Sequence, residues 1–245
     1  MLYPKHVRVV VLQSNYIPWK GYFDLIHDAD LFVYYDEVQY TKNDWRNRNR
    51  IYPKNGLQWL SIPIAKRAVK QRISEVELPA TDWRTAHYKS LYYGYASAPC
   101  FGQLEPLLVD VYQQREWKHL VELNRHLIET ISRMLGIETR FEDSRNFSLE
   151  GDRVTRLIAL LKHVGATEYI SGPAGRDYLS GSEGLFADND IRTIYKDYGG
   201  YPTYAQLADP FEHGVSILDL LANLPLEEIP YYVWGWRGSS AGQGV

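Results

Sequence analysis

Short β-branched runs alternate with helix-length segments at both ends of this chain, and this alternation limits the choice of fold more than any other feature. Residues 7–13 have the length and composition of a buried strand, residues 22–29 fit a short helix, and residues 31–35 fit a second strand. A strand–helix–strand order predicts a right-handed unit with parallel strands. The same alternation returns later, with strands predicted at 137–141, 168–171 and 191–196 and helices at 153–164 and 216–222.

The middle of the chain, about residues 82–136, has helical periodicity instead. Asp82 is placed to cap a helix start, and Gly136 suits the position after a helix end. Helices are predicted at 83–95, 105–114 and 117–135. We therefore predict an α/β fold, with a mainly parallel twisted sheet, flanking helices and this helical insertion. The predicted organisation is a single domain over residues 1–237, followed by a flexible tail at 238–245.

Length and composition exclude several protein classes. The chain has 245 residues, of which 45% are apolar, so it can bury one sizeable core. Its single cysteine, Cys100, excludes an internal disulfide framework and a cysteine-rich metal site. No signal-peptide pattern is present, and no apolar run approaches the roughly 20 residues that cross a bilayer. We expect a cytoplasmic protein without stable membrane insertion.

Positive charge is concentrated in residues 42–72, a segment predicted to be irregular loop with one strand at 59–64. Nine of the 27 Lys and Arg residues fall in this segment, with one acid, Asp44, although the whole chain carries a net charge of −3. Solubility alone favours mixed signs, so this clustering predicts a site for an anion, most simply phosphate. The alternative is a solvated surface whose charges pair with Asp36, Glu37 and Asp44.

The loop that follows the first predicted strand is rich in amides and aromatic rings. Gln13 and Asn15 offer hydrogen-bond donors and acceptors, while Tyr16 and Trp19 could wall a sugar or base ring. The loop lacks the glycine spacing of a phosphate-binding loop. The alternative is a structured turn whose path Pro18 fixes and whose rings pack inward.

A second constellation lies within residues 36–50. In an extended segment, Arg46, Arg48 and Arg50 would share one face, and a guanidinium group binds phosphate through a planar pair of donors. The members that we predict to contact a ligand are Gln39, Lys42, Trp45, Arg46, Asn47 and Arg48.

The histidines and the loop after residue 170 supply further candidates. His87, near the start of an aromatic-rich helix, is the predicted acid or base, and the other histidines are expected to be structural. No metal-binding motif is present. Ser171, Gly172 and Tyr178 belong to a tight loop that can approach a ligand. Ser171 would need a nearby base to act as a nucleophile, so hydrogen bonding to a ligand or a turn role stays open.

Together these motifs resemble the WbqC-like proteins. The matching stretches, in order along nearly the whole chain, are residues 13–23, 36–42, 45–49, 169–173 and 216–221. Ser14 departs from the pattern, since the family usually has proline there. The resemblance implies a role connected with bacterial O-antigen and other surface-polysaccharide gene clusters. It also implies a shared site formed by Gln13, Asn15, Trp19, Lys42, Trp45, Arg46, Asn47 and Arg48.

The leading hypothesis is an enzyme that transfers an acyl or aminoacyl group to the amine of a nucleotide-activated amino sugar. Arg46, Arg48 and Lys42 would hold the diphosphate. Tyr16, Trp19 or Trp45 would stack on the ligand. His87 would take the amine proton, and Lys42 is the second catalytic candidate.

Two other functions stay open. One is ATP-dependent nucleotidyl transfer or ligation, which rests on fold analogy alone. The other is a non-catalytic partner protein that binds a nucleotide sugar or carbohydrate. Nucleic acid is not an expected partner, because the net charge is negative and no binding motif is present. The sequence identifies no cofactor, no donor or acceptor, no oligomeric state and no requirement for Mg²⁺; the expected partner is a nucleotide-activated sugar or another phosphorylated small molecule.

Overall fold

The computed structural model describes residues 6–239. The chain divides into two compact units, and each is built from three separate segments. Unit 1 contains the described residues up to Gln13, then Asp24–Glu37 and Ile137–Gly200. Unit 2 contains Ser14–Phe23, Val38–Gly136 and the described residues from Tyr201. Helix α1 (Lys20–His27) is shared by the two units: its residues up to Phe23 belong to unit 2, and those from Asp24 belong to unit 1.

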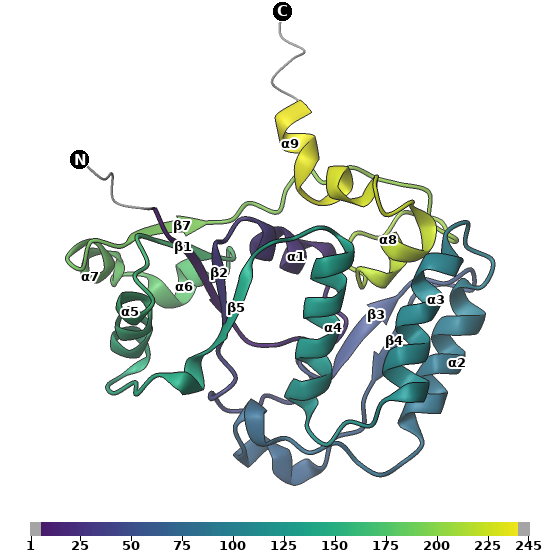
Figure 1. Ribbon diagram of the computed structural model, residues 1–245, viewed down its shortest axis with the longest axis horizontal. Coiled ribbons are helices and arrows are strands. Elements are labelled where there is room, and N and C mark those ends of the chain that lie inside the picture. Colours follow the sequence, from purple (N-terminus) through teal and green to yellow (C-terminus); the bar gives the residue numbers. More distant parts are fainter. Residues whose placement is uncertain (1–5, 240–245) are drawn as a thin grey trace, which may run out of the picture. The chain divides into compact units, whose positions relative to one another are not determined.

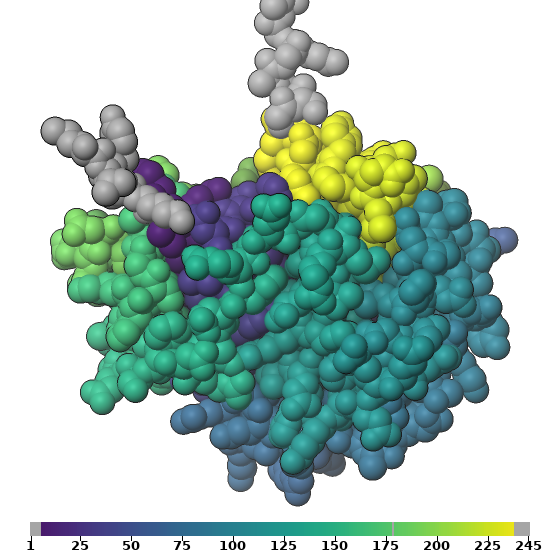
Figure 2. Space-filling model, in the orientation of Figure 1, coloured from purple at the N-terminus to yellow at the C-terminus, as the bar shows by residue number. Residues whose placement is uncertain are grey.

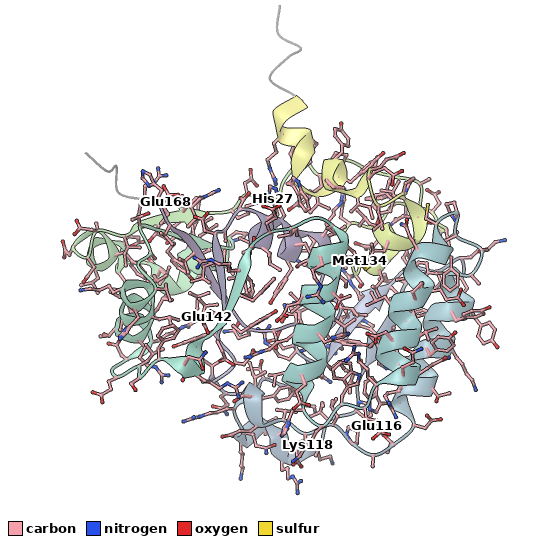
Figure 3. The ribbon with its side chains drawn as sticks, viewed as in Figure 1. His27, Glu116, Lys118, Met134, Glu142 and Glu168 are labelled. Atoms are coloured by element: carbon pink, nitrogen blue, oxygen red, sulfur yellow. The ribbon has the colours of Figure 1, made fainter. Side chains whose placement is uncertain are left out.

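Unit 1 contains a parallel sheet of five strands, in the order β5-β2-β1-β6-β7 (Figure 1). This sheet confirms the predicted α/β fold class. The strands are β1 (Arg8–Leu12), β2 (Leu31–Tyr34), β5 (Arg140–Asp143), β6 (Glu168–Ser171) and β7 (Arg192–Tyr195). The helices of this unit are α5 (Arg153–His163), α6 (Gly175–Leu179) and α7 (Glu183–Ala187). Figure 3 labels Glu142 on β5 and Glu168 at the start of β6.

The strand order of this sheet reverses between β1 and β6. Counted along the chain, the five strands follow a third-second-first-fourth-fifth arrangement. In such open sheets, ligands bind at the carboxyl edge beside the reversal. Gln13 follows β1 there, and Gly172 follows β6. The core below this edge includes Val9, Val33, Leu161 and Tyr169.

Unit 2 combines helices with a β-hairpin. Its helices are α2 (Trp83–Tyr95), α3 (Phe101–Val109), α4 (Leu120–Met134), α8 (Leu218–Asn223) and α9 (Trp236–Ser239). Helices α2 and α3 lie side by side, and with α4 they form the face of this unit seen in Figure 2. The apolar stripe of α4 is buried at Leu120, Leu123, Leu127 and Ile131, as the periodicity predicts, while Met134 at its end (Figure 3) is half-buried.

The hairpin consists of β3 (Arg48–Ile51) and β4 (Gln58–Ser61), which pair antiparallel. The sequence predicts a strand at 59–64 and irregular loop elsewhere in the basic segment, so the expectation of a loop at β3 was wrong. The Arg-Asn-Arg-Ile sequence of β3 lacks the β-branched and aromatic residues by which strands are recognised. A short 3₁₀ helix, Lys66–Lys70, also interrupts the segment, and a second, Ile73–Glu75, follows it.

At the carboxyl end, helix α9 extends through Ser239. The flexible tail at 238–245 stays a prediction. The remainder of that tail, residues 240–245, lies outside the described residues. The single-domain organisation stays a prediction. Across residues 6–239, no helix combines the length and the apolar character needed to span a bilayer.

Candidate ligand-binding site

The side chains of strand β3 alternate between a buried face and a partly exposed face of the hairpin. Along β3, Asn49 is buried, while Arg48 and Arg50 point to the opposite, partly exposed face. Both guanidinium groups lie over the ring of Trp59 on β4, at 4.4 Å and 5.9 Å from its centroid. Trp45 stacks on Trp59 with 5.7 Å between ring centroids, and both indoles are exposed. The result is an accessible surface of arginine and tryptophan.

Buried Asn49 ties this hairpin to the first polar loop. Its Nδ2 donates to the carbonyl oxygens of Tyr16, at 3.1 Å, and Ile17, at 2.9 Å. Ile17 has a φ of 36°, a conformation that β-branched residues rarely adopt. The two hydrogen bonds and the full burial of Ile17 hold the loop in that conformation.

A second set of contacts joins the same loop to the residues before β3. The guanidinium of Arg46 donates to Oδ1 of Asn15, and the Tyr16 N–H donates to the Trp45 carbonyl at 3.0 Å. Arg46 also pairs with Asp44 at 3.5 Å. The loop and the basic segment, which we predicted independently as ligand-binding, therefore meet in unit 2. Arg46 is held by protein partners at this junction.

One cavity in unit 2 has a volume of about 290 Å³, and we call it the aromatic cavity. It is lined by Asn15, Pro18, Trp19, Trp45, Asn49, Arg50 and Gly214. Three of the predicted ligand-binding residues, Asn15, Trp19 and Trp45, are among them. Tyr16 is fully buried instead, so the indoles are the rings that face this cavity.

Another cavity in unit 2 has a volume of about 370 Å³, and we call it the basic cavity. It is lined by Tyr40, Lys42, Asn43, Asn47, Arg48, Ser61, Ile64, Ala65, Lys66 and Val69. Its cations are Lys42, Arg48 and Lys66, and no acid is found among the described residues of its lining. Predicted residue Gln39 is next to it, since its Nε2 donates to the Val69 carbonyl at 2.7 Å. This cavity has the chemistry of an anion site.

The arginines at these cavities retain unused hydrogen-bonding capacity. Nη2 of Arg48 donates to the Asn43 carbonyl at 2.6 Å, and Asn43 has a φ of 62°. The buried Nε atoms of Arg48 and Arg50 have no hydrogen-bond partner within residues 6–239. A buried donor without an acceptor costs free energy, so an acceptor from water or a ligand would stabilise this arrangement.

His87 lies apart from the described linings of both cavities, in a buried network. Its Nδ1 is 2.7 Å from the Tyr16 hydroxyl, and its Nε2 is 3.3 Å from the Ser61 carbonyl oxygen. Because a carbonyl oxygen only accepts, Nε2 carries the proton and Nδ1 accepts from Tyr16. The Tyr16 hydroxyl is in turn in short contact with the Tyr112 hydroxyl. Burial lowers the pKa of His87 to about 4, and the bond to Ser61 opposes this shift. The predicted acid–base role of His87 stays a prediction.

The pKa of His87 has a measurable effect on stability. A histidine whose folded pKa lies below its unfolded pKa of about 6.5 stabilises the protein above that value and loses the contribution as the pH falls toward 4. We expect His87 to account for about 2 kcal/mol of the unfolding free energy lost between pH 6.5 and 4.5. Urea unfolding of the wild type and of His87→Gln at both pH values checks this. An unchanged pH dependence in the variant would contradict the assignment.

The remaining predicted residues belong to unit 1. Gln13 and Ser171–Gly172 lie at the carboxyl edge of the sheet, beside the reversal of strand order. Ser171 is buried against Gly175, where a Cβ atom would collide with the Ser171 Oγ. This close contact accounts for a glycine at position 175, and both alternatives for Ser171 stay predictions. The side chain of Tyr178 lies outside the described part of the chain.

Several residues at these cavities were not among the predicted ligand contacts. Lys66 was counted only among the cations of the basic segment, and Arg50 was placed on one face with Arg46 and Arg48 but was not selected. Asn49 was not selected either. Trp59, over which Arg48 and Arg50 lie, was not singled out. Nothing in the sequence points to Gly214, because its place at the cavity depends on long-range packing. Within residues 6–239, no three His, Cys, Asp or Glu side chains are grouped to hold a metal ion.

The fold and the cavities describe an α/β protein in which a basic cavity and an aromatic cavity both border strand β3. The chain matches the WbqC-like protein family over residues 13–231, and it belongs to that family. It is also 44% identical over 225 residues to the uncharacterized protein Rv1507c of Mycobacterium tuberculosis (strain ATCC 25618 / H37Rv). That alignment covers 91% of this chain and 96% of the relative. No solved structure matches the chain.

Proposed function

We propose that this protein is a bacterial surface-polysaccharide (O-antigen) biosynthesis enzyme that binds a nucleotide-activated amino sugar and transfers an acyl or aminoacyl group to its amine. The observation that carries the proposal is the basic cavity, where Lys42, Arg48 and Lys66 converge. The association of WbqC-like proteins with surface-polysaccharide gene clusters supports the choice of pathway.

The basic cavity supports a phosphorylated ligand. Three cations around a volume of about 370 Å³ would complement the charge of a diphosphate group. Arg48 supplies a planar pair of donors, and the two lysines supply compact charges that adapt to the position of the oxygens. A phosphate oxygen would also bring an acceptor close to the arginine donors of this surface.

The aromatic cavity supports a ring-bearing part of the same ligand. Trp19 and Trp45 offer apolar faces to a sugar or base. The Oδ1 of Asn15 is occupied by Arg46, which leaves the Asn15 N–H groups for a ligand oxygen. Both cavities border β3, so one elongated ligand with a charged and a ring-bearing part would span them.

The proposed reaction forms an amide. The sugar amine would attack the carbonyl carbon of an activated acyl donor such as a thioester. A carbon–nitrogen bond would form, the carbon–sulfur bond would break, and the amine proton would pass to a base. Binding the diphosphate in the basic cavity would fix the position of the sugar amine relative to the acyl donor. This positioning would lower the entropic part of the activation barrier.

Thermal unfolding with a panel of ligands tests the proposal. A ligand bound only by the native state at about 100 times its Kd adds roughly 2.7 kcal/mol, which raises the Tm of a protein of this size by about 5 °C or more. We expect this rise with a nucleotide-linked amino sugar, followed by amide formation when an acyl donor is added. A rise with ATP alone would support nucleotidyl transfer or ligation, and binding without turnover would support a non-catalytic partner. No rise with any phosphorylated ligand would contradict a phosphate site.

A further inference from the structure

Lys20 is a buried lysine without a carboxylate partner. Its side chain is 1% exposed, and its Nζ lies over the rings of Tyr201, Tyr204 and Phe211 at 4.9, 5.7 and 5.7 Å. Within residues 6–239, its hydrogen-bond partner is Nδ1 of His213, at 3.2 Å. No ion pair in the described part of the chain includes Lys20. A buried ammonium is rarely left in such surroundings, because desolvation makes the charge costly.

The burial of Lys20 favours loss of its proton, and the nearby carboxylate of Asp219 opposes that loss only in part. Burial lowers the pKa of Lys20 to about 8, while the negative charge of Asp219 acts in the opposite direction. The Asp219 carboxylate is occupied by hydrogen bonds from Tyr95 (2.9 Å), Tyr204 (2.6 Å) and Gln206 (2.8 Å). These contacts limit what the carboxylate offers to the amine.

His213 connects the buried amine of Lys20 with the protein surface, because its residue is exposed while its Nδ1 contacts Lys20. Partial burial of the ring and the charge of Lys20 lower the pKa of His213, and Glu212 opposes the shift. The ring of His213 packs edge-on against Phe211 at 4.6 Å. Its two ring nitrogens suit it to pass a proton between a group outside and the amine inside.

The pair lies beside the aromatic cavity. The chain neighbours of Lys20 and His213, namely Trp19 and Gly214, both line that cavity. The two segments pair directly, with an antiparallel bridge between Trp19 and Ser216 and a hydrogen bond from the Ile217 N–H to the Pro18 carbonyl at 2.8 Å. The exposed imidazole is therefore carried one residue from Gly214 of the cavity lining, as Lys20 is carried one residue from Trp19.

We infer that Lys20 and His213 form a proton relay for the aromatic cavity. The substrate amine gives a proton to Nε2 of His213 as its nitrogen bonds to the acyl carbon, and Nδ1 of His213 passes its own proton to the neutral amine of Lys20. The relay ends with a neutral histidine and a Lys20 ammonium, which then releases the proton to water. This inference rests on the proposed acyl transfer and supplies its base, a role for which neither residue was predicted.

Nuclear magnetic resonance of the histidine rings tests the coupling without any substrate. We expect the His213 signals to show an inflection near pH 8, where Lys20 loses its proton, and Lys20→Met to abolish that inflection. His163, an exposed histidine elsewhere, is the internal control and should not respond. If the wild-type His213 signals show no inflection between pH 7 and 9, the relay is wrong. That result is decisive even if Lys20→Met does not fold.

Kinetics of amide formation separate this inference from the proposed function. We expect His213→Gln to lower kcat by about 100-fold or more, in the range of lost general-base catalysis, while the Kd of the nucleotide sugar changes less than about threefold. His163→Gln is the matched control and should keep wild-type kcat. Unchanged kcat in His213→Gln overturns the relay alone. Absence of sugar binding in the wild type, with the pH 8 inflection present, overturns the proposed function and leaves a coupled Lys20–His213 pair.

Discussion

Replacing Arg48 with alanine is expected to weaken binding of a nucleotide-activated sugar by about 10- to 100-fold. A hydrogen bond to a charged group contributes roughly 1.5–3 kcal/mol, and each 1.4 kcal/mol corresponds to a factor of ten in affinity. Arg48 is half-buried at the edge of the hairpin, and it contacts Trp59 and the Asn43 carbonyl. Its loss should therefore lower the unfolding free energy by only about 1 kcal/mol. Isothermal titration calorimetry measures the affinity, and urea unfolding measures the fold.

Arg67→Ala is the matched control for this variant. Arg67 belongs to the same basic segment, but its side chain is 78% exposed and it is not among the described residues that line either cavity. Removing it takes away one positive charge without touching the basic cavity, so affinity should change less than twofold at physiological salt. Equal losses in both variants would mean that general positive charge, and not the basic cavity, binds the ligand. Arg46→Ala is less informative, because Arg46 contacts Asn15 and Asp44.

Replacing Asp219 with alanine is expected to lower the unfolding free energy by about 3–5 kcal/mol. The carboxylate is fully buried and accepts hydrogen bonds from Tyr95, Tyr204 and Gln206. Alanine leaves the Tyr95 and Tyr204 hydroxyls without this acceptor, whereas Gln206 keeps the Glu212 carbonyl at 3.0 Å. It also removes the negative charge that raises the pKa of Lys20. Urea unfolding at pH 7 measures the difference.

Asp82→Ala provides the comparison for Asp219. Asp82 is exposed, and although it precedes α2 its side chain makes no capping hydrogen bond, so its removal should cost less than about 0.5 kcal/mol. Asp219→Asn should fall between the two, since burial raises the pKa of Asp219 and an amide resembles its neutral form. A stability of Asp219→Ala within 1 kcal/mol of the wild type would show that the network does not stabilise the fold.

The fold was predictable where burial dictates composition. The central strands β1 and β2 are apolar on both faces, and their Val- and Leu-rich runs identified them within two residues of their observed ends. Helix α4 was found from its apolar stripe. The hairpin was missed because β3 is built from arginine and asparagine, and its pairing with β4 is set by neighbours that local propensity does not reveal.

The candidate site could be predicted in its chemistry but not in its arrangement. Charge clustering pointed to Lys42 and Arg48, which do share the basic cavity, and the loop motif pointed to Asn15 and Trp19, which do share the aromatic cavity. The sequence does not show that Arg46 is held by Asn15 whereas Arg48 lines the basic cavity. His87 was favoured because its helix is rich in aromatic residues, and it is enclosed by Trp83 of that helix and by Tyr16 of the first polar loop. The sequence analysis did not select Lys20, because a single lysine within a motif is normally exposed and its sequence position does not reveal that it is buried.

The order of strands in unit 1 has a consequence for how this protein is made. The backbone of Val7 bonds to Thr167, 160 residues later, and β6 flanks β1 at the centre of the sheet. At roughly 5–20 residues per second, a ribosome needs about 8–30 seconds to add that stretch. During this interval the Val-Val-Val segment of β1 lacks its pairing with β6, so its apolar side chains and backbone groups are open to aggregation. Production in cells should therefore depend on chaperones that shield β1, and slow translation or high temperature should increase the aggregated fraction.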